Sequence, residues 1–203
     1  MGHIRRQTLS SRGAACLDAM RRWLLMLLCL AATGAAAAGQ ISVVEAAIAP
    51  DGRGQALTAQ FDINLGPRLE EAVNYGVPLD FRFEFTLSRR RWYWIDEHIT
   101  GRVLRYQLGY NALTRQYRLS FGGLHQKFAT LAEALRALGR IARLHVVDAG
   151  ELEPGADYRA AVRLSLDHTQ LPKPLQIDSL TEQHWRVEAE TRRWDFIAGP
   201  PPP

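Results

Sequence analysis

The clearest pattern in the sequence is a strict alternation of apolar and polar residues from Leu79 to Ser88. Leucine or phenylalanine occupies every odd position of this segment, and a polar or charged residue occupies every even one. A period of two is typical of a β-strand that buries one face and exposes the other. Such a strand needs a second layer to cover its apolar face, so this segment predicts a layered β structure.

Other segments predict further strands and two helices. A second alternation runs from Ala56 to Leu65, and shorter apolar segments predict strands at residues 41–48, 99–110, 116–121, 141–147, 158–166 and 185–197. Pro67 stands in the first turn of one predicted helix, which ends at Gly76. Thr130 and Glu133 form a capping box at the start of the other, which is expected to continue to Arg140.

Strands therefore dominate, and most connections between them are short turns. This favours a mainly β fold, an antiparallel β-sandwich with two short helices, for which an immunoglobulin-like or fibronectin-like topology is a candidate. The alternative is an α+β fold with the helices on one face of an antiparallel sheet. The segment from Leu152 to Tyr158 has the form of a tyrosine corner, in which the hydroxyl bonds back to the corner backbone, or else of an ordinary turn before a buried tyrosine.

The first 38 residues have the composition of a targeting segment. Met20 is followed by Arg21 and Arg22, by ten apolar residues from Trp23 to Ala32, and by small residues up to Ala38. This order is typical of a secretory signal peptide, so we expect cleavage near Ala38 and export to the periplasm, with residues 1–19 a mis-assigned start. Uncleaved, the segment would be an inner-membrane anchor, but its second half is Ala, Gly and Thr rather than strongly apolar.

Removal of this leader changes the charge and the cysteine content. Five of the 25 Lys and Arg residues and one of the 21 Asp and Glu residues precede Gly39, so residues 39–203 carry no net charge. A balanced chain gives no support for binding nucleic acid. Both cysteines, Cys16 and Cys29, also leave, which excludes a disulfide-linked partner. We expect a single domain over residues 39–198 and a proline-rich tail at 199–203.

Arginine and aromatic residues gather in two segments, each of which shifts its aromatic residues from odd to even positions. Such a shift indicates a β-bulge that redirects side chains. If the two strands are neighbours, their residues form a binding surface for an anionic or aromatic group, because guanidinium groups bind carboxylates and stack on rings. The predicted binding residues are Arg89, Arg90, Arg91, Trp92, Trp94, Arg192, Arg193 and Trp194. The alternative is structural, with the rings in the core and the arginines solvated or paired with Glu84, Asp96, Glu188 and Glu190.

Asp96, Glu97 and His98 are the candidates for acid–base catalysis. On an extended chain Asp96 and His98 share a face, so the carboxylate could orient the imidazole. Hydrolysis of this kind also needs a nucleophile, but no serine lies in a recognisable motif and no cysteine follows the leader. The spacing of the histidines is not that of a metal site. We therefore expect neither a metal nor a cofactor.

Several motifs together resemble the family of the domain of unknown function 4390. They include Trp92-Tyr-Trp94, the helix that contains Leu135, and Leu171-Pro-Lys-Pro-Leu175, and the resemblance extends over residues 40–197. It implies an exported proteobacterial protein without an assigned activity, so no catalytic residue is carried over. It also implies a partner, because genes of this family often lie near that of a membrane sensor kinase of the nitrogen-regulation type.

These features favour a non-catalytic periplasmic binding or protein-interaction module. Its partner is expected to be a membrane or periplasmic protein such as that kinase. The alternative is a small-substrate hydrolase that uses Asp96, Glu97 and His98.

Overall fold

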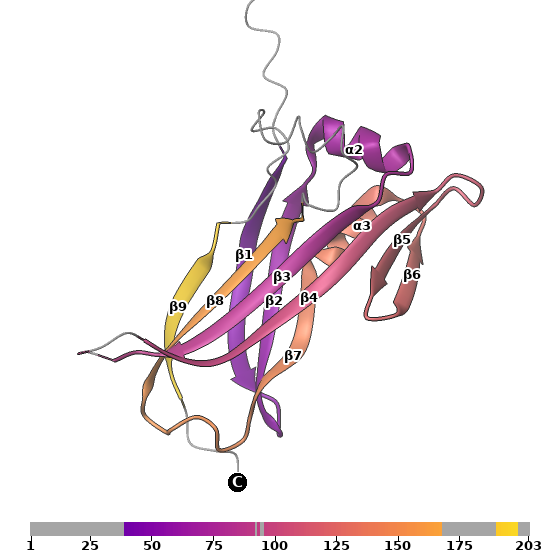
Figure 1. The fold of residues 1–203 in the computed structure, drawn as a ribbon. Coiled ribbons are helices and arrows are strands. Elements are labelled where there is room, and N and C mark those ends of the chain that lie inside the picture. The colour runs from indigo at the N-terminus through magenta and orange to yellow at the C-terminus, as the bar shows by residue number, and fades with distance from the viewer. Residues whose placement is uncertain (1–38, 92, 94–95, 168–189, 199–203) are drawn as a thin grey trace, which may run out of the picture. The chain divides into compact units, whose positions relative to one another are not determined.

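The larger of two sheets contains six antiparallel strands in the computed structural model (Figure 1), which describes residues 39–91, 93, 96–167 and 190–198. The segment with the strongest alternation, β3, lies inside this sheet with a neighbour on each side. In spatial order the strands are β6 (Leu124–Phe128), β5 (Gln116–Phe121), β4 (Glu97–Asn111), β3 (Leu79–Arg89), β8 (Asp157–Leu166) and β9 (Arg192–Ile197).

The smaller sheet contains three antiparallel strands, in the order β1 (Gln40–Pro50), β2 (Gly54–Asn64) and β7 (Arg140–Asp148). Figure 1 shows it behind the larger sheet, with β3 and β8 passing in front of β2. The two sheets therefore form two layers.

The apolar core lies between these layers. All odd-numbered residues of β3 from Leu79 to Leu87 are buried, and Phe83 meets Phe61 of β2 edge to face, with ring centroids 5.9 Å apart. Alternate residues of β8 from Tyr158 to Leu166 are buried as well. Removal of this apolar surface from water is the main term that stabilises such a fold. The predicted mainly β sandwich with two helices is confirmed.

The strands pair as they do in an immunoglobulin-like sandwich. In order, β1, β2 and β7 correspond to strands A, B and E, and β9, β8, β3 and β4 to strands G, F, C and C′. The tyrosine corner lies between strands E and F, as that topology requires: the backbone N–H of Glu153 donates to the hydroxyl of Tyr158 at 2.9 Å. The corner predicted from Leu152 to Tyr158 is confirmed, while β5 and β6 extend the larger sheet beyond the immunoglobulin plan.

Two short helices connect strands. Helix α2 (Gly66–Asn74) joins β2 to β3 and buries Leu69 and Val73. Helix α3 (Leu131–Leu138) joins β6 to β7 and begins with the predicted capping box of Thr130 and Glu133. The end of α3 lies close to β2, because the N–H of Phe61 donates to the carbonyl of Gly139 at 2.8 Å.

Some elements differ from the sequence-based expectation. Helix α3 ends at Leu138, because Arg140 already pairs with Gln60 as the first residue of β7. Strand β6 has no predicted counterpart, since four of its five residues are exposed and show no alternation. Strand β9 begins at Arg192; residues 185–189, the leader and the tail at 199–203 lie outside the described residues. In the part of the chain that the structure describes, no helix is long and apolar enough to cross a membrane.

Candidate functional site

The first predicted arginine segment lies where β3 ends. The strand stops at Arg89, and the chain turns through residues 90–96, here called the β3–β4 loop, before β4 begins. Just before this loop the pairing shifts: Leu87 is opposite Thr100 but Ser88 is opposite His98. A register shift of this kind re-aims the side chains around it. The extra residue is Ile99 of β4, whereas β3 pairs with β8 without a shift up to Arg89, so the bulge predicted in the strand before the arginine segment lies on the neighbouring strand instead.

Arg89 joins the end of β3 to the tyrosine corner. Its Nη1 donates to Glu153 Oε1 at 2.6 Å, and its Nη2 pairs with Glu153 Oε2. The hydrogen bonds to Glu153 raise the pKa of Arg89 above its usual value, so the guanidinium stays charged. Because the N–H of Glu153 also binds the hydroxyl of Tyr158, the start of the loop is linked to the start of β8.

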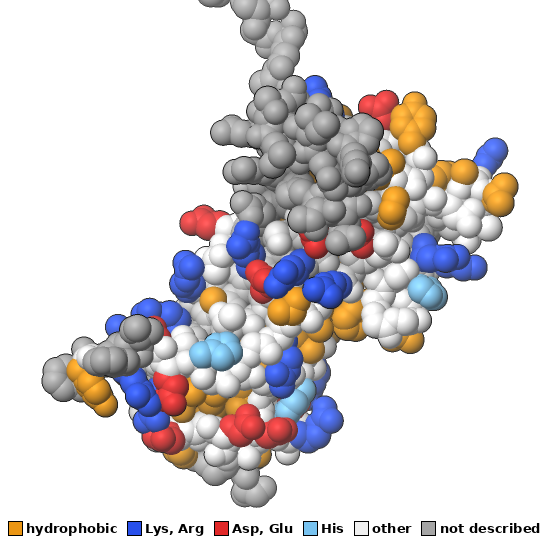
Figure 2. Space-filling view, viewed as in Figure 1, with side chains coloured by type: hydrophobic (Ala, Val, Ile, Leu, Met, Phe, Trp, Pro, Cys, Tyr) orange, Lys and Arg blue, Asp and Glu red, His pale blue; other side chains and the backbone are white. Residues whose placement is uncertain are grey.

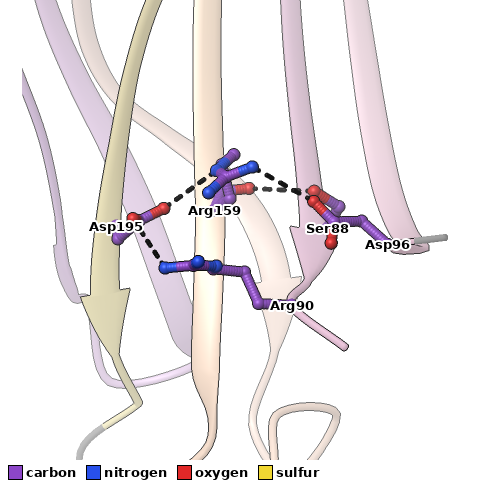
Figure 3. A network of polar contacts seen from close by, with 5 residues as sticks. All are labelled: Ser88, Arg90, Asp96, Arg159 and Asp195. Carbon is purple, nitrogen blue, oxygen red and sulfur yellow. Dashed lines mark hydrogen bonds and ion pairs between the residues drawn. The ribbon is translucent and has the colours of Figure 1, made fainter. Parts of the chain in front are cut away.

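Arg159 of β8 is the centre of a network that joins four segments (Figure 3). Its Nε donates to Asp195 Oδ1 of β9 at 3.0 Å, and its Nη1 donates to Asp96 Oδ2 at 3.3 Å. Asp195 accepts a further bond from Arg90 Nη1 at 3.3 Å, and Ser88 Oγ donates to the carbonyl of Arg159 at 3.4 Å. The hydrogen bond to Asp195 raises the pKa of Arg159. Both ends of the β3–β4 loop are thus held against β8 and β9.

The charges in this region are balanced. Arg91 pairs with Glu97, so four arginines face four carboxylates. We call these residues the arginine network: Arg89, Arg90, Arg91, Arg159, Asp96, Glu97, Glu153 and Asp195. Their side chains are between 30% and 65% exposed, so solvent screens each pair and its contribution to stability is small. The network therefore holds the two ends of the loop more than it stabilises the fold.

The aromatic residues of the predicted site divide between the loop and the core. Tyr93 of the β3–β4 loop is 65% exposed, whereas Trp92 and Trp94 lie outside the described residues. Trp194 of β9 is partly buried and packs against the core. Tyr93 is consequently the described aromatic residue that this end of the sheet presents to solvent.

The second predicted arginine pair lies apart from the network. Strand β8 separates β3 from β9, so the two predicted segments are not on neighbouring strands. Arg192 and Arg193 are exposed at the start of β9, and they line a groove of about 550 Å³ together with residues 40–43 of β1. Arg90 reaches β9 only at Asp195. The structure thus distributes the predicted arginines between the arginine network and this groove.

The proposed acid–base group is part of the network. Asp96 accepts from Arg159, and Glu97 pairs with Arg91. His98 is exposed at the second position of β4, and among the described contacts it has no hydrogen bond to either carboxylate. Each carboxylate that could serve as a base is therefore bound to a guanidinium.

One serine does face a histidine, although the sequence alone did not single it out. Ser120 Oγ of β5 lies 2.8 Å from His125 Nδ1, because the two residues are directly opposite in the pairing of β5 and β6. A catalytic triad also needs a carboxylate that orients the imidazole. None binds His125 within the described ranges, so the pair lacks the third member.

His145 has the most strongly charged surroundings of the described histidines. Its Nε2 lies 2.9 Å from Asp148 Oδ1, and its Nδ1 lies 3.3 Å from Asp51 Oδ2 in the β1–β2 turn. The hydrogen bonds to Asp148 and Asp51 raise the pKa of His145. Burial alone would raise the pKa of Asp51, but bonds from the Arg53 N–H and from His145 outweigh it and lower the pKa.

In the sequence, only the closeness of His145 and Asp148 indicates this cluster, because Asp51 is distant along the chain. No group of three or more His, Cys, Asp and Glu side chains in the described chain could hold a metal ion. The cluster therefore serves to tie the β1–β2 turn to the end of β7.

The chain matches the model of a protein family, the domain of unknown function DUF4390, over residues 38–195. This range contains every member of the arginine network. No curated protein and no solved structure matches the chain.

Proposed function

We propose that this chain, which belongs to the DUF4390 family, is a non-catalytic binding module of the periplasm. The observation that carries the proposal is the β3–β4 loop, whose two ends are held by Arg90 and Asp96 while Tyr93 is 65% exposed. Holding the two ends of a loop before binding lowers the conformational entropy that is lost when a partner binds, and exposed tyrosines supply contact area. Immunoglobulin-like sandwiches commonly carry their binding loops at the ends of the sheets.

The rival function, hydrolysis by Asp96, Glu97 and His98, has less support. Both carboxylates are engaged by arginines, and a general base must be free to accept a proton from its substrate. Hydrolysis of ester, amide or phosphate substrates that disappears in His98→Ala, with an unchanged melting temperature, would favour the enzyme over the binding module.

Export is the first part of the proposal that can be measured. It rests on the order of the leader, in which Arg21 and Arg22 precede an apolar segment and small residues up to Ala38. We expect the protein recovered from the periplasm to lack residues 20–38 and both cysteines. Intact-mass spectrometry checks this, and a species that retains Trp23 to Ala32 would favour a membrane anchor instead.

The partner that we propose is the extracytoplasmic part of a membrane protein, with a sensor kinase as the first candidate. Tagged mature protein should capture it from solubilised membranes. The Arg90→Gln/Arg192→Gln variant should capture less, because it removes one cation beside the loop and one from the groove by β1. Its melting temperature should stay within about 3 °C of the parent, because exposed charges contribute little to stability.

The two single variants assign the effect to one place. Loss of capture in Arg90→Gln alone supports the β3–β4 loop, and loss in Arg192→Gln alone moves the contact to the groove. Unfolding of the double variant would show that the arginine network is chiefly structural, and unchanged capture would show that neither place is the interface.

A further inference from the structure

The distribution of charge along the large sheet indicates a second surface. From His98 to Ala132 the sequence contains no aspartate and no glutamate, yet it contains five basic residues: Arg102, Arg105, Arg115, Arg118 and Lys127. This segment forms nearly all of β4 and the whole of β5 and β6. Because residues 39–203 are neutral overall, these three strands carry an excess of positive charge that the rest of the chain balances elsewhere.

Three of the five cations face outward from the sandwich. Residues directly opposite each other on neighbouring strands lie on the same face of a sheet, and Asp80, Gln107, Ser120 and His125 are opposite one another in turn from β3 to β6. Even positions of β3 face away from the core, so this row lies on the outer face. Side chains alternate between the two faces along a strand, so the residues two positions away from this row on each strand also lie on the outer face. We call the exposed set the basic face: Arg105, Arg118, His125 and Lys127.

Figure 2 shows this side of the sheet. Over β5 and β6 the view contains Lys, Arg and His side chains, whereas the acidic side chains lie elsewhere: by α2, near the centre, and toward the left edge and lower end of the view. The basic face is therefore not interrupted by carboxylates on these strands.

Like charges are paired across the strands of this face. Arg105 is directly opposite Arg82, and Arg118 is directly opposite Lys127, an arrangement that destabilises a sheet. Arg82 is offset by Glu84, whose Oε1 lies 2.8 Å from its Nε. In the described part of the chain no carboxylate forms an ion pair with Arg105, Arg118 or Lys127. An anionic partner would remove this repulsion.

An apolar tip lies beside the cations. Leu113, in the turn between β4 and β5, is 97% exposed. Val103, 50% exposed on the outer face of β4, lies away from this turn and opposite Glu84. Within this turn, Asn111 Oδ1 accepts from the N–H groups of Leu113 and Thr114 at 3.0 and 3.1 Å. An acidic protein would need only the cations, whereas apolar side chains next to basic ones are typical of proteins that bind anionic membrane surfaces.

We propose that the basic face binds an anionic phospholipid surface and that Leu113 enters its headgroup region. This docking goes beyond the function proposed above and needs no protein partner. It would hold an exported protein beside the membrane and so raise its effective concentration around a membrane partner.

Sedimentation of the exported protein with vesicles tests the docking, because vesicles contain no protein. We expect binding to vesicles of equal parts phosphatidylglycerol and phosphatidylcholine, and none to pure phosphatidylcholine. At about 1 M salt, where charges are screened beyond about 3 Å, binding should disappear. Arg118→Gln/Lys127→Gln should weaken it about 25-fold, at about fivefold for each cation removed.

A matched control separates the basic face from net charge. Arg53→Gln/Arg140→Gln removes two exposed cations from the smaller sheet and its β1–β2 turn, and it should bind as the parent does. Relief of repulsion should raise the melting temperature of the Arg118→Gln/Lys127→Gln variant, so loss of binding there would not reflect unfolding. The proposal would be overturned if both variants weakened binding equally or if the protein bound neither kind of vesicle. Binding to polyglutamate but not to vesicles would overturn it as well.

Discussion

At the scale of single residues, His145 predicts how stability depends on pH. Its pKa is raised from 6.5 by the hydrogen bonds to Asp148 and Asp51, so its protonated form stabilises the folded protein. That contribution is complete below the unfolded pKa of about 6.5 and is lost as the pH rises through the higher pKa of the folded state. We expect the melting temperature to fall over this range and His145→Gln to flatten the decline.

Thermal unfolding of both proteins between about pH 5 and 9 measures the effect. The difference between the two melting temperatures, and not either value alone, isolates the histidine from other groups. His98→Gln is the control, since it removes an exposed histidine. Parallel curves for His145→Gln and the parent would contradict the assignment.

Residues differ in how far their contacts follow from the sequence. Tyr158 could be predicted, because its partner Glu153 lies five residues away in a motif whose spacing dictates the geometry. Arg90 and Asp195 are 105 residues apart, and their meeting depends on the position of β9 beside β8. No local pattern encodes that order. The carboxylates that we expected to pair with the arginines were chosen by their closeness in sequence. They therefore included Asp96, which belongs to the network, but not Asp195 or Glu153.

At the scale of elements, the end of α3 predicts the effect of a small substitution. Alanine is favoured over glycine in helices by about 1 kcal/mol, and Gly139 has an ordinary φ of −72°. A Cβ there would nevertheless lie 2.4 Å from the carbonyl oxygen of Phe61, and Phe61 is buried in β2. We expect Gly139→Ala to lower the free energy of unfolding by about 1–3 kcal/mol, measured by denaturant titration.

Gly109→Ala is the matched control, because a Cβ at Gly109 meets no atom within 4 Å. It should leave stability nearly unchanged. A stabilised Gly139→Ala would show that α3 can move away from β2 and that this contact does not fix the helix.

Elements with one buried face could be predicted, and those without one could not. The pattern of β3 reflects the core directly, and the capping box of α3 satisfies backbone N–H groups within four residues. Strand β6 lies at the edge of the sheet with four of its five residues exposed, so burial leaves no period in its sequence. The basic face was missed for the same reason, since it arises from the pairing of three strands.

At the scale of the whole molecule, the large sheet carries the two surfaces for which we propose separate tasks. The β3–β4 loop lies where β3, β8 and β9 are joined by the arginine network, and the basic face lies on β4, β5 and β6. Because β4 contributes Glu97 to the network and Arg105 to the basic face, a bound membrane surface and a bound partner would share one sheet as their support. The sandwich could be predicted from the alternation of apolar and polar residues, whereas the two surfaces depend on the order of the strands in the sheet.

The central claim is that the β3–β4 loop is the contact surface of a periplasmic binding module, and crosslinking in cells tests it most directly. A photoreactive benzoylphenylalanine would replace Tyr93 in one variant and Tyr75 in another, since Tyr75 is 82% exposed at the end of α2. We predict one discrete adduct with a membrane protein from position 93 and none with that protein from position 75. The same adduct from both positions, or none from position 93, would contradict the account.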